Sequence, residues 1–127
     1  MSKSSLLIVD GDAYYAGIFA NRFEAAGWKV WVTESIEDAH KQLTKDVPDA
    51  VIIDPSGLDE PLEFLHALRL GGETSKCILM VLTELGDREL IKKAENLGSS
   101  GYFFKGHFFP SEAIKKLQRL VDERGRN

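Results

Sequence analysis

The sequence has 127 residues, of which 43% are hydrophobic and 9% aromatic. This length is typical of one domain, and the apolar fraction is large enough for a hydrophobic core, which argues against a disordered chain. Sixteen lysines and arginines stand against twenty aspartates and glutamates, for a formal net charge of -4. A net acidic chain lacks the positive field that drives nucleic-acid binding, so we expect no direct nucleic-acid partner.

Cysteine content and hydropathy bear on the cellular compartment. Cys77 is the single cysteine and cannot form an internal disulfide, which suits a reducing environment. No apolar run approaches the roughly 20 residues that a transmembrane helix needs. The first residues lead directly into an apolar strand ending at Asp10, without the features of a signal peptide. We expect a cytoplasmic protein that makes no membrane contact.

Short β-favouring apolar runs alternate along the chain with segments of helical periodicity. The predicted strands are residues 6–9, 30–33, 50–53, 77–82 and 102–104, and the predicted helices begin near residues 13, 35, 62, 87 and 111. Strands that alternate with helices require crossover connections, so we expect one parallel sheet with helices on both faces. We expect a single domain over residues 1–127, with a core at about 5–121 and a tail or linker stub at 122–127.

Polar side chains follow four of the predicted strands. They are Asp10 with Asp12, Asp54, Thr83 and Lys105. Because the carboxyl ends of parallel strands meet at one edge of the sheet, the functional site is expected there. Converging carboxylates suit Mg²⁺, and a neighbouring lysine and hydroxyl suit the oxygens of a phosphoryl group.

These motifs, in this order, resemble the receiver domain of bacterial two-component response regulators. The resemblance spans residues 6–121 and is carried by Leu-Leu-Ile-Val-Asp10, Val-Ile-Ile-Asp54, Val-Leu-Thr83 and Gly98-Ser-Ser-Gly-Tyr-Phe-Phe-Lys105. It implies a CheY-like (flavodoxin-like) α/β fold, a doubly wound five-stranded parallel sheet in the order 2-1-3-4-5 with five helices. It also implies a signalling protein and not an enzyme, at most catalysing its own phosphorylation and dephosphorylation.

The resemblance also assigns roles to individual residues. Asp54 matches the aspartate that takes a phosphoryl group from a histidine kinase. Lys105 matches the lysine that pairs with the phosphoryl oxygens, and Thr83 the hydroxyl residue that follows the phosphoryl group during the switch. Tyr102 matches the aromatic residue that reports the switch.

A Mg²⁺ ion is the cofactor that the resemblance implies. Asp10 and Asp54 match two of its ligands, with Asp12 and the backbone carbonyl of Ser56 as further candidates. Gly11, however, stands where the family usually has a second acidic residue. Either Asp12 reaches the ion from a shifted loop, or the affinity for Mg²⁺ is reduced or lost.

Two further departures surround the site. The lysine of the family is normally followed by a cis proline, whereas Lys105 is followed by Gly106. A cis bond before a non-proline residue costs about 2.5–4 kcal/mol, so we expect this turn to be rebuilt in trans. In addition, Leu58 occupies a position of the loop after Asp54 where a proline is common.

The C-terminal part of the chain is basic, with eight basic and four acidic residues from Lys92 onward. In receivers this region commonly forms the partner surface, to which the resemblance assigns Lys92, Lys115, Lys116 and Arg119. The expected partners are a histidine kinase or phosphotransfer protein, a downstream effector protein or domain, and a second copy of the chain. The phenylalanines at 103, 104, 108 and 109 exceed what a short edge strand needs, so part of this group is expected to be exposed for docking.

Three alternatives remain at this stage. A pseudo-receiver would keep the fold and bind partners without being phosphorylated. A small phosphatase similar to the haloacid dehalogenases would use Asp10 and Asp12, but that family places further carboxylates after its lysine. A flavodoxin would need a hydroxyl-rich phosphate loop after the first strand, where this chain has acidic residues.

Overall fold

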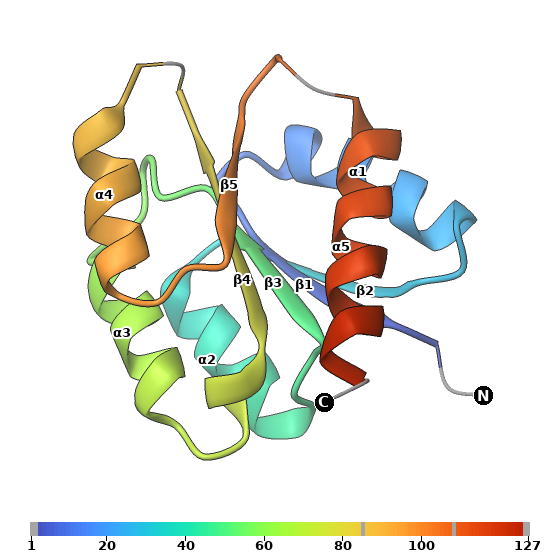
Figure 1. Ribbon diagram of the computed structural model, residues 1–127, viewed down its shortest axis with the longest axis horizontal. Coiled ribbons are helices and arrows are strands. Elements are labelled where there is room, and N and C mark those ends of the chain that lie inside the picture. The colour runs from blue at the N-terminus through green and yellow to red at the C-terminus, as the bar shows by residue number, and fades with distance from the viewer. Residues whose placement is uncertain (1–2, 85, 108, 126–127) are drawn as a thin grey trace.

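The computed structural model describes residues 3–84, 86–107 and 109–125 (Figure 1). Its strands are β1 (Ser5–Val9), β2 (Lys29–Thr33), β3 (Ala50–Ile53), β4 (Ile78–Thr83) and β5 (Gly101–Phe104). All neighbouring strands pair in parallel, in the order β2-β1-β3-β4-β5. This arrangement confirms the predicted fold.

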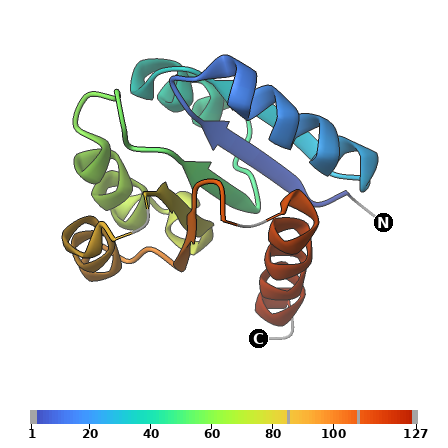
Figure 2. The same ribbon diagram turned by 90° about the horizontal axis from the view of Figure 1, so that it is seen from above.

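Five helices cover the two faces of the sheet. They are α1 (Ala13–Ala25), α2 (Ile36–Lys45), α3 (Pro61–Leu70), α4 (Arg88–Asn96) and α5 (Pro110–Gly125), with a short 3₁₀ turn η1 (Thr74–Lys76) before β4. Helices α1 and α5 lie on one side of the sheet, and α2, α3 and α4 lie on the other (Figures 1 and 2). No helix in the described part of the chain is long and apolar enough to span a membrane.

Each face of the sheet has its own hydrophobic core, because alternate residues of a strand point to opposite faces. On the first face, Ile8 and Ile52 pack with Phe23 of α1. On the second face, Val9 and Ile53 belong to the cluster that includes residues of α2, α3 and α4. The three central strands are therefore apolar at successive positions, as expected for strands covered on both sides.

Side-chain caps fix where three of the helices begin. Asp12 accepts hydrogen bonds from the backbone N–H groups of Tyr14 and Tyr15, Ser35 accepts one from Asp38, and Asp87 accepts one from Leu90. Caps of this kind satisfy backbone donors that have no partner within the helix. The helix starts expected at Ser35 and Asp87 are thus confirmed.

The C-terminal helix is longer than the sequence suggested. It continues past Val121 to Gly125, through residues expected to form a tail, while residues 126 and 127 lie outside the described part of the chain. Two side-chain pairs spaced four residues apart support the extra turn: Gln118 with Asp122, and Arg119 with Glu123. The Arg124 guanidinium then donates a hydrogen bond to the carboxylate of Asp49, the residue before β3.

Candidate functional site at the carboxyl edge of the sheet

Three polar side chains are buried at the carboxyl ends of the central strands. Asp10, Asp54 and Thr83 are only 1%, 2% and 2% exposed. The hydrogen bonding of the sheet continues past the strands and fixes the backbone there, because Asp10 N–H donates to Thr33, Asp54 N–H to Val9, and Lys105 N–H to Thr83. The sheet therefore brings together Asp10, Asp54, Thr83 and Lys105, as the sequence predicted.

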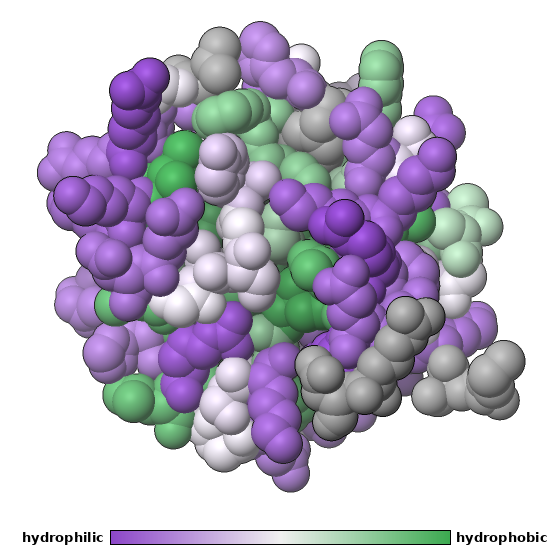
Figure 3. All heavy atoms as spheres, in the orientation of Figure 1, coloured by the Kyte–Doolittle hydropathy of each residue, from purple (hydrophilic) through white to green (hydrophobic). Residues whose placement is uncertain are grey.

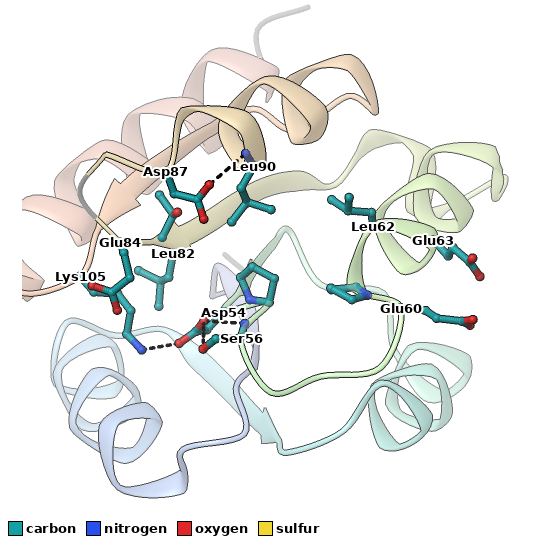
Figure 4. Close-up of a pocket in the computed structure, with 13 residues that line it drawn as sticks. Asp54, Ser56, Glu60, Leu62, Glu63, Leu82, Glu84, Asp87, Leu90 and Lys105 are labelled. Carbon is teal, nitrogen blue, oxygen red and sulfur yellow. Dashed lines mark hydrogen bonds and ion pairs between the residues drawn. The ribbon is translucent and has the colours of Figure 1, made fainter.

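The Asp54 carboxylate uses both of its oxygens in hydrogen bonds (Figure 4). Its Oδ2 accepts from Nζ of Lys105 at 2.5 Å. Its Oδ1 accepts from the backbone N–H of Ser56 at 3.0 Å and from the Ser56 hydroxyl at 2.8 Å. These bonds compensate for the loss of water around a buried charge. The pKa of Lys105 is raised, chiefly by its hydrogen bond to Asp54.

The Asp10 carboxylate, in contrast, has a hydrogen-bond partner for only one of its two oxygens. Its Oδ1 accepts from the backbone N–H of Asp12 at 2.9 Å, whereas its buried Oδ2 has no hydrogen-bond partner. Burial raises the pKa of Asp10, and the nearby charge of Asp54 raises it further, while the Asp12 N–H and Lys105 act in the opposite direction. A buried carboxylate oxygen that lacks a donor and lies near a second carboxylate fits a cation as its partner.

The Thr83 hydroxyl is the second buried group without a partner in the described part of the chain. Thr83 lines a pocket of about 450 Å³ together with Asp54 and Lys105. A buried hydroxyl that can donate is costly to leave unpaired, so it marks a place where a ligand oxygen would be stabilised.

The same pocket extends between α3 and α4 and has apolar walls, including Leu62, Leu82 and Leu90 (Figure 4). Glu84, which is exposed, also lines this pocket, and its charge contributes to the raised pKa of Lys105. Glu84 was not among the site residues expected from the sequence. Its position directly after Thr83, at the end of a buried strand, was the available signal.

Asp12 has a structural role in addition to the one expected of it. Its exposed side chain caps α1 by accepting from Tyr14 N–H at 3.1 Å and Tyr15 N–H at 3.2 Å. Among residues 3–84, 86–107 and 109–125, no group of three or more His, Cys, Asp or Glu side chains is arranged to hold a metal ion. Whether Asp12 is also a metal ligand stays a prediction.

The structure clarifies the two glycine substitutions around the site. Gly11 has open space where a Cβ would be placed, with no atom within 4 Å. The peptide bonds in the described residues are all trans, which confirms the prediction for the Lys105–Gly106 bond, and Gly106 has φ 76°. This left-handed conformation is readily adopted by glycine and cannot be adopted by proline.

Tyr15, which was not among the site residues expected from the sequence, also contacts Lys105. Nζ of Lys105 lies 5.1 Å from the centre of the Tyr15 ring, which projects from the first turn of α1. No sequence motif marks this contact, because residues 15 and 105 are brought together by the fold alone.

The residues assigned to a partner surface lie on α4 and α5, and Tyr102, which was assigned to the switch, lies between these helices in the sequence, on β5. Tyr102 is 37% exposed and its ring lies 5.2 Å from that of Phe104. Lys92 and Lys115 are exposed, whereas Lys116 places its ammonium 5.5 Å from the centre of the Phe103 ring and Arg119 pairs with Glu123. Figure 3 shows that the strip between α4 and α5 is less hydrophilic than the helices beside it.

The phenylalanines near the end of the chain differ in their exposure to solvent. Phe103 is buried in the first core, Phe104 is partly buried, and Phe109 is 72% exposed. Phe108 lies outside the described residues. Part of this group is therefore exposed, as expected, but the exposed phenylalanine precedes α5 and is not in the strand.

Comparisons with known proteins agree with this geometry. No protein-family model matches the sequence. The acid tolerance regulatory protein ActR of Sinorhizobium medicae is 32% identical over 122 residues, covering 95% of this chain and 60% of that protein. The probable chemotaxis protein CheY of Rhizobium etli is 22% identical, covering 94% of this chain and 91% of its own length.

A solved structure provides a third comparison. A crystal structure from Chloroflexus aurantiacus, assigned to a response regulator, superposes with a TM-score of 0.86 at 28% identity, covering 95% of this chain and 99% of that one. The fold, the site at the carboxyl edge and these relatives together support a receiver domain of two-component signalling. The chain spans about 60% of the length of its ActR relatives.

Proposed function

We propose that this receiver domain accepts a phosphoryl group on Asp54 in a Mg²⁺-dependent reaction and thereby switches a protein-interaction surface. One observation carries the proposal: two buried polar atoms without partners, Oδ2 of Asp10 and Oγ1 of Thr83, belong to the same site as the paired Asp54 and Lys105. A phosphoryl group and a cation would provide the partners that these two atoms lack.

The transfer would proceed by in-line displacement. An oxygen of Asp54 forms the bond to phosphorus while the P–N bond of a donor phosphohistidine breaks, and the electron pair of that bond stays on the departing imidazole nitrogen. Lys105 is bonded to Oδ2, so its ammonium lies beside the place that an oxygen of the incoming phosphoryl group would take. Lys105 therefore holds the carboxylate before the reaction and offsets phosphoryl charge during it.

The donor set fits a Mg²⁺ site of modest affinity. Asp10 and Asp54 would supply carboxylate oxygens, and the backbone carbonyl of Ser56 is a further candidate ligand. Bound there, Mg²⁺ would offset negative charge on the transferring group. Mg²⁺ is commonly held by one or two carboxylates together with water and substrate phosphate, so the missing side chain at Gly11 weakens the site without abolishing it.

The second candidate function is that of a pseudo-receiver that binds partners without being phosphorylated. The Asp54–Lys105 ion pair favours it, because this pair balances one buried negative charge without a metal. The Thr83 hydroxyl argues against it, since this buried group has no hydrogen-bond partner among the described protein groups of the unphosphorylated site.

We further propose that the switched surface comprises α4, β5 and α5, with Tyr102, Lys92, Lys115, Lys116 and Arg119 among its residues. Its partners would be a histidine kinase or phosphotransfer protein on the input side, and an effector protein or domain, or a second copy of the chain, on the output side. The exposed lysines favour acidic partner surfaces.

Phosphorylation can be measured by intact-protein mass spectrometry after incubation with acetyl phosphate. The wild type is expected to gain one phosphoryl group when Mg²⁺ is present and none in EDTA. Asp54→Asn is expected to gain none, and Asp49→Asn serves as the matched control because Asp49 lies at the opposite end of β3. A wild-type protein that gains no phosphoryl group would support the pseudo-receiver instead. An Asp54→Asn protein that gains one would show that Asp54 is not the acceptor.

A further inference from the structure

Lys105 is held from two sides. Its ammonium donates to Asp54 on one side, and the face of the Tyr15 ring lies 5.1 Å away on the other. The Lys105 side chain is mostly but not fully buried, with 23% of its surface exposed. The negatively charged face of an aromatic ring attracts an ammonium group, and the attraction strengthens where water is partly excluded.

Tyr15 is itself anchored by its surroundings. Its backbone N–H donates to the Asp12 carboxylate, which fixes the first turn of α1. Its ring packs against that of Phe19 at a centre-to-centre distance of 5.2 Å and borders the first core. A ring held in this way can direct a flexible lysine without large movements of its own.

The turn after Lys105 explains why such a contact is needed. Lys105 directly follows β5 and its backbone N–H donates to the Thr83 carbonyl, and the next residue is Gly106 in a left-handed conformation. A hydrogen bond from the His107 N–H to the Phe104 carbonyl closes this turn, but it restricts the backbone and not the Lys105 side chain. A long lysine side chain at such a position has many rotamers to lose before it can point at Asp54.

We propose that Tyr15 is a positioning residue that holds the Lys105 ammonium against Asp54, in place of a rigid turn after the lysine. The effect on phosphorylation rests on the proposed function, whereas the effect on Lys105 itself does not. The phenol oxygen lies close to the same groups: burial raises the pKa of Tyr15, and Lys105 and the Gly106 N–H lower it.

The first test measures the contact without any phosphoryl chemistry. The ring of Tyr15 should shift the proton resonances of the Lys105 side chain upfield in the NMR spectrum of the wild type and of Tyr15→Phe. Tyr15→Leu should return them to ordinary positions. Tyr14→Leu is the matched control, because Tyr14 is the preceding residue of the same turn and is 81% exposed. Ordinary Lys105 resonances in the wild type would overturn the proposal.

The second test measures the rate of phosphorylation by acetyl phosphate. Loss of a cation–π contact at a partly exposed site corresponds to about a two- to fivefold change, so Tyr15→Leu should be slower than the wild type by that factor. Tyr15→Phe and Tyr14→Leu should retain the wild-type rate. In a Lys105→Met background, Tyr15→Leu should have no further effect. An equal loss in both backgrounds would show a merely structural role and would overturn the proposal.

The two tests separate the two hypotheses. If the wild type is not phosphorylated but the Lys105 resonances respond to Tyr15→Leu, the proposed function fails and the positioning role stands. If phosphorylation occurs but neither the resonances nor the rate respond to Tyr15→Leu, the positioning role fails and the proposed function stands.

Discussion

The two ends of the sheet differ in whether their buried or partly buried polar groups have hydrogen-bond partners. At the amino end, the Asp49 carboxylate accepts from the Ser5 N–H, the Ser5 hydroxyl and the Arg124 guanidinium, which also donates to two backbone carbonyls. At the carboxyl end, Oδ2 of Asp10 and Oγ1 of Thr83 have no partner. The first end is arranged for stability, and the second carries an energetic cost that a ligand would relieve.

The largest expected effect on stability is at the amino end. Asp49→Ala removes the acceptor of three hydrogen bonds and leaves the partly buried Arg124 without its carboxylate. We expect the free energy of unfolding to fall by about 2–3 kcal/mol, measured by urea denaturation. Phosphorylation of Asp54 should persist at temperatures where the variant is folded. A loss below about 0.5 kcal/mol, which is ordinary for a surface substitution, would remove the contrast between the two ends.

Replacing Asp10 should raise the free energy of unfolding, whereas replacing Asp49 lowers it. Asp10→Asn removes a buried charge whose second oxygen has no partner, so we expect the free energy of unfolding to rise by about 1–2 kcal/mol at neutral pH. The same variant should lose Mg²⁺-dependent phosphorylation. A variant less stable than the wild type would contradict the view that this carboxylate is a cost to the fold.

The pH dependence of this gain follows from the direction of the Asp10 pKa shift. Burial raises the native pKa of Asp10 above 3.8. Between pH 3.8 and the raised native value, the native state binds more protons than the unfolded state, so the wild type loses stability as the pH rises through this window. The stability gained by Asp10→Asn over the wild type should therefore be greatest above the native pKa of Asp10 and shrink toward pH 3.8. Denaturation curves at several pH values would measure this difference.

Gly11→Asp should raise the Mg²⁺ affinity of the site at the carboxyl edge of the sheet. A Cβ at this position meets open space, and Gly11 is not in a left-handed conformation, so the fold should accept the change. One added carboxylate near the cation is expected to raise Mg²⁺ affinity by about tenfold or more. Gly11→Asn is the control for charge. Equal affinities for the wild type and Gly11→Asp would show that the missing carboxylate does not limit binding.

Asp12 allows its two possible roles to be separated with a smaller effect. Asn caps helices about as well as Asp, whereas Ala does not, so Asp12→Ala should lower the free energy of unfolding by about 1 kcal/mol and Asp12→Asn should leave it nearly unchanged. If Asp12 only caps α1, Asp12→Asn should retain the wild-type affinity for Mg²⁺. A clear loss of affinity in Asp12→Asn would establish Asp12 as a metal ligand.

Most of the fold could be predicted from the sequence, because strands buried on both faces leave continuous apolar runs such as residues 50–53. The carboxyl edge was predictable for the same reason, since parallel strands deliver their last residues to one place. Asp10, Asp54, Thr83 and Lys105 were found in this way.

Contacts that depend on side-chain direction could not be predicted. An acidic residue after a strand can cap a helix or bind a cation, and only the structure shows Asp12 in hydrogen bonds to the first turn of α1. The ring of Tyr15 over Lys105 and the ammonium of Lys116 over Phe103 join residues far apart in the chain or on different elements. No periodicity in the sequence records such pairs.

The most direct test of the account is the Mg²⁺-dependent binding of beryllofluoride, a phosphoryl mimic, observed by NMR. We predict that the resonances of Thr83 and Lys105 shift in the wild type when Mg²⁺ and beryllofluoride are both present, and that neither shifts in Asp54→Ala. Unchanged Thr83 resonances in the wild type, or identical shifts in Asp54→Ala, would contradict the claim that the unpaired groups at the carboxyl edge serve a phosphoryl group on Asp54.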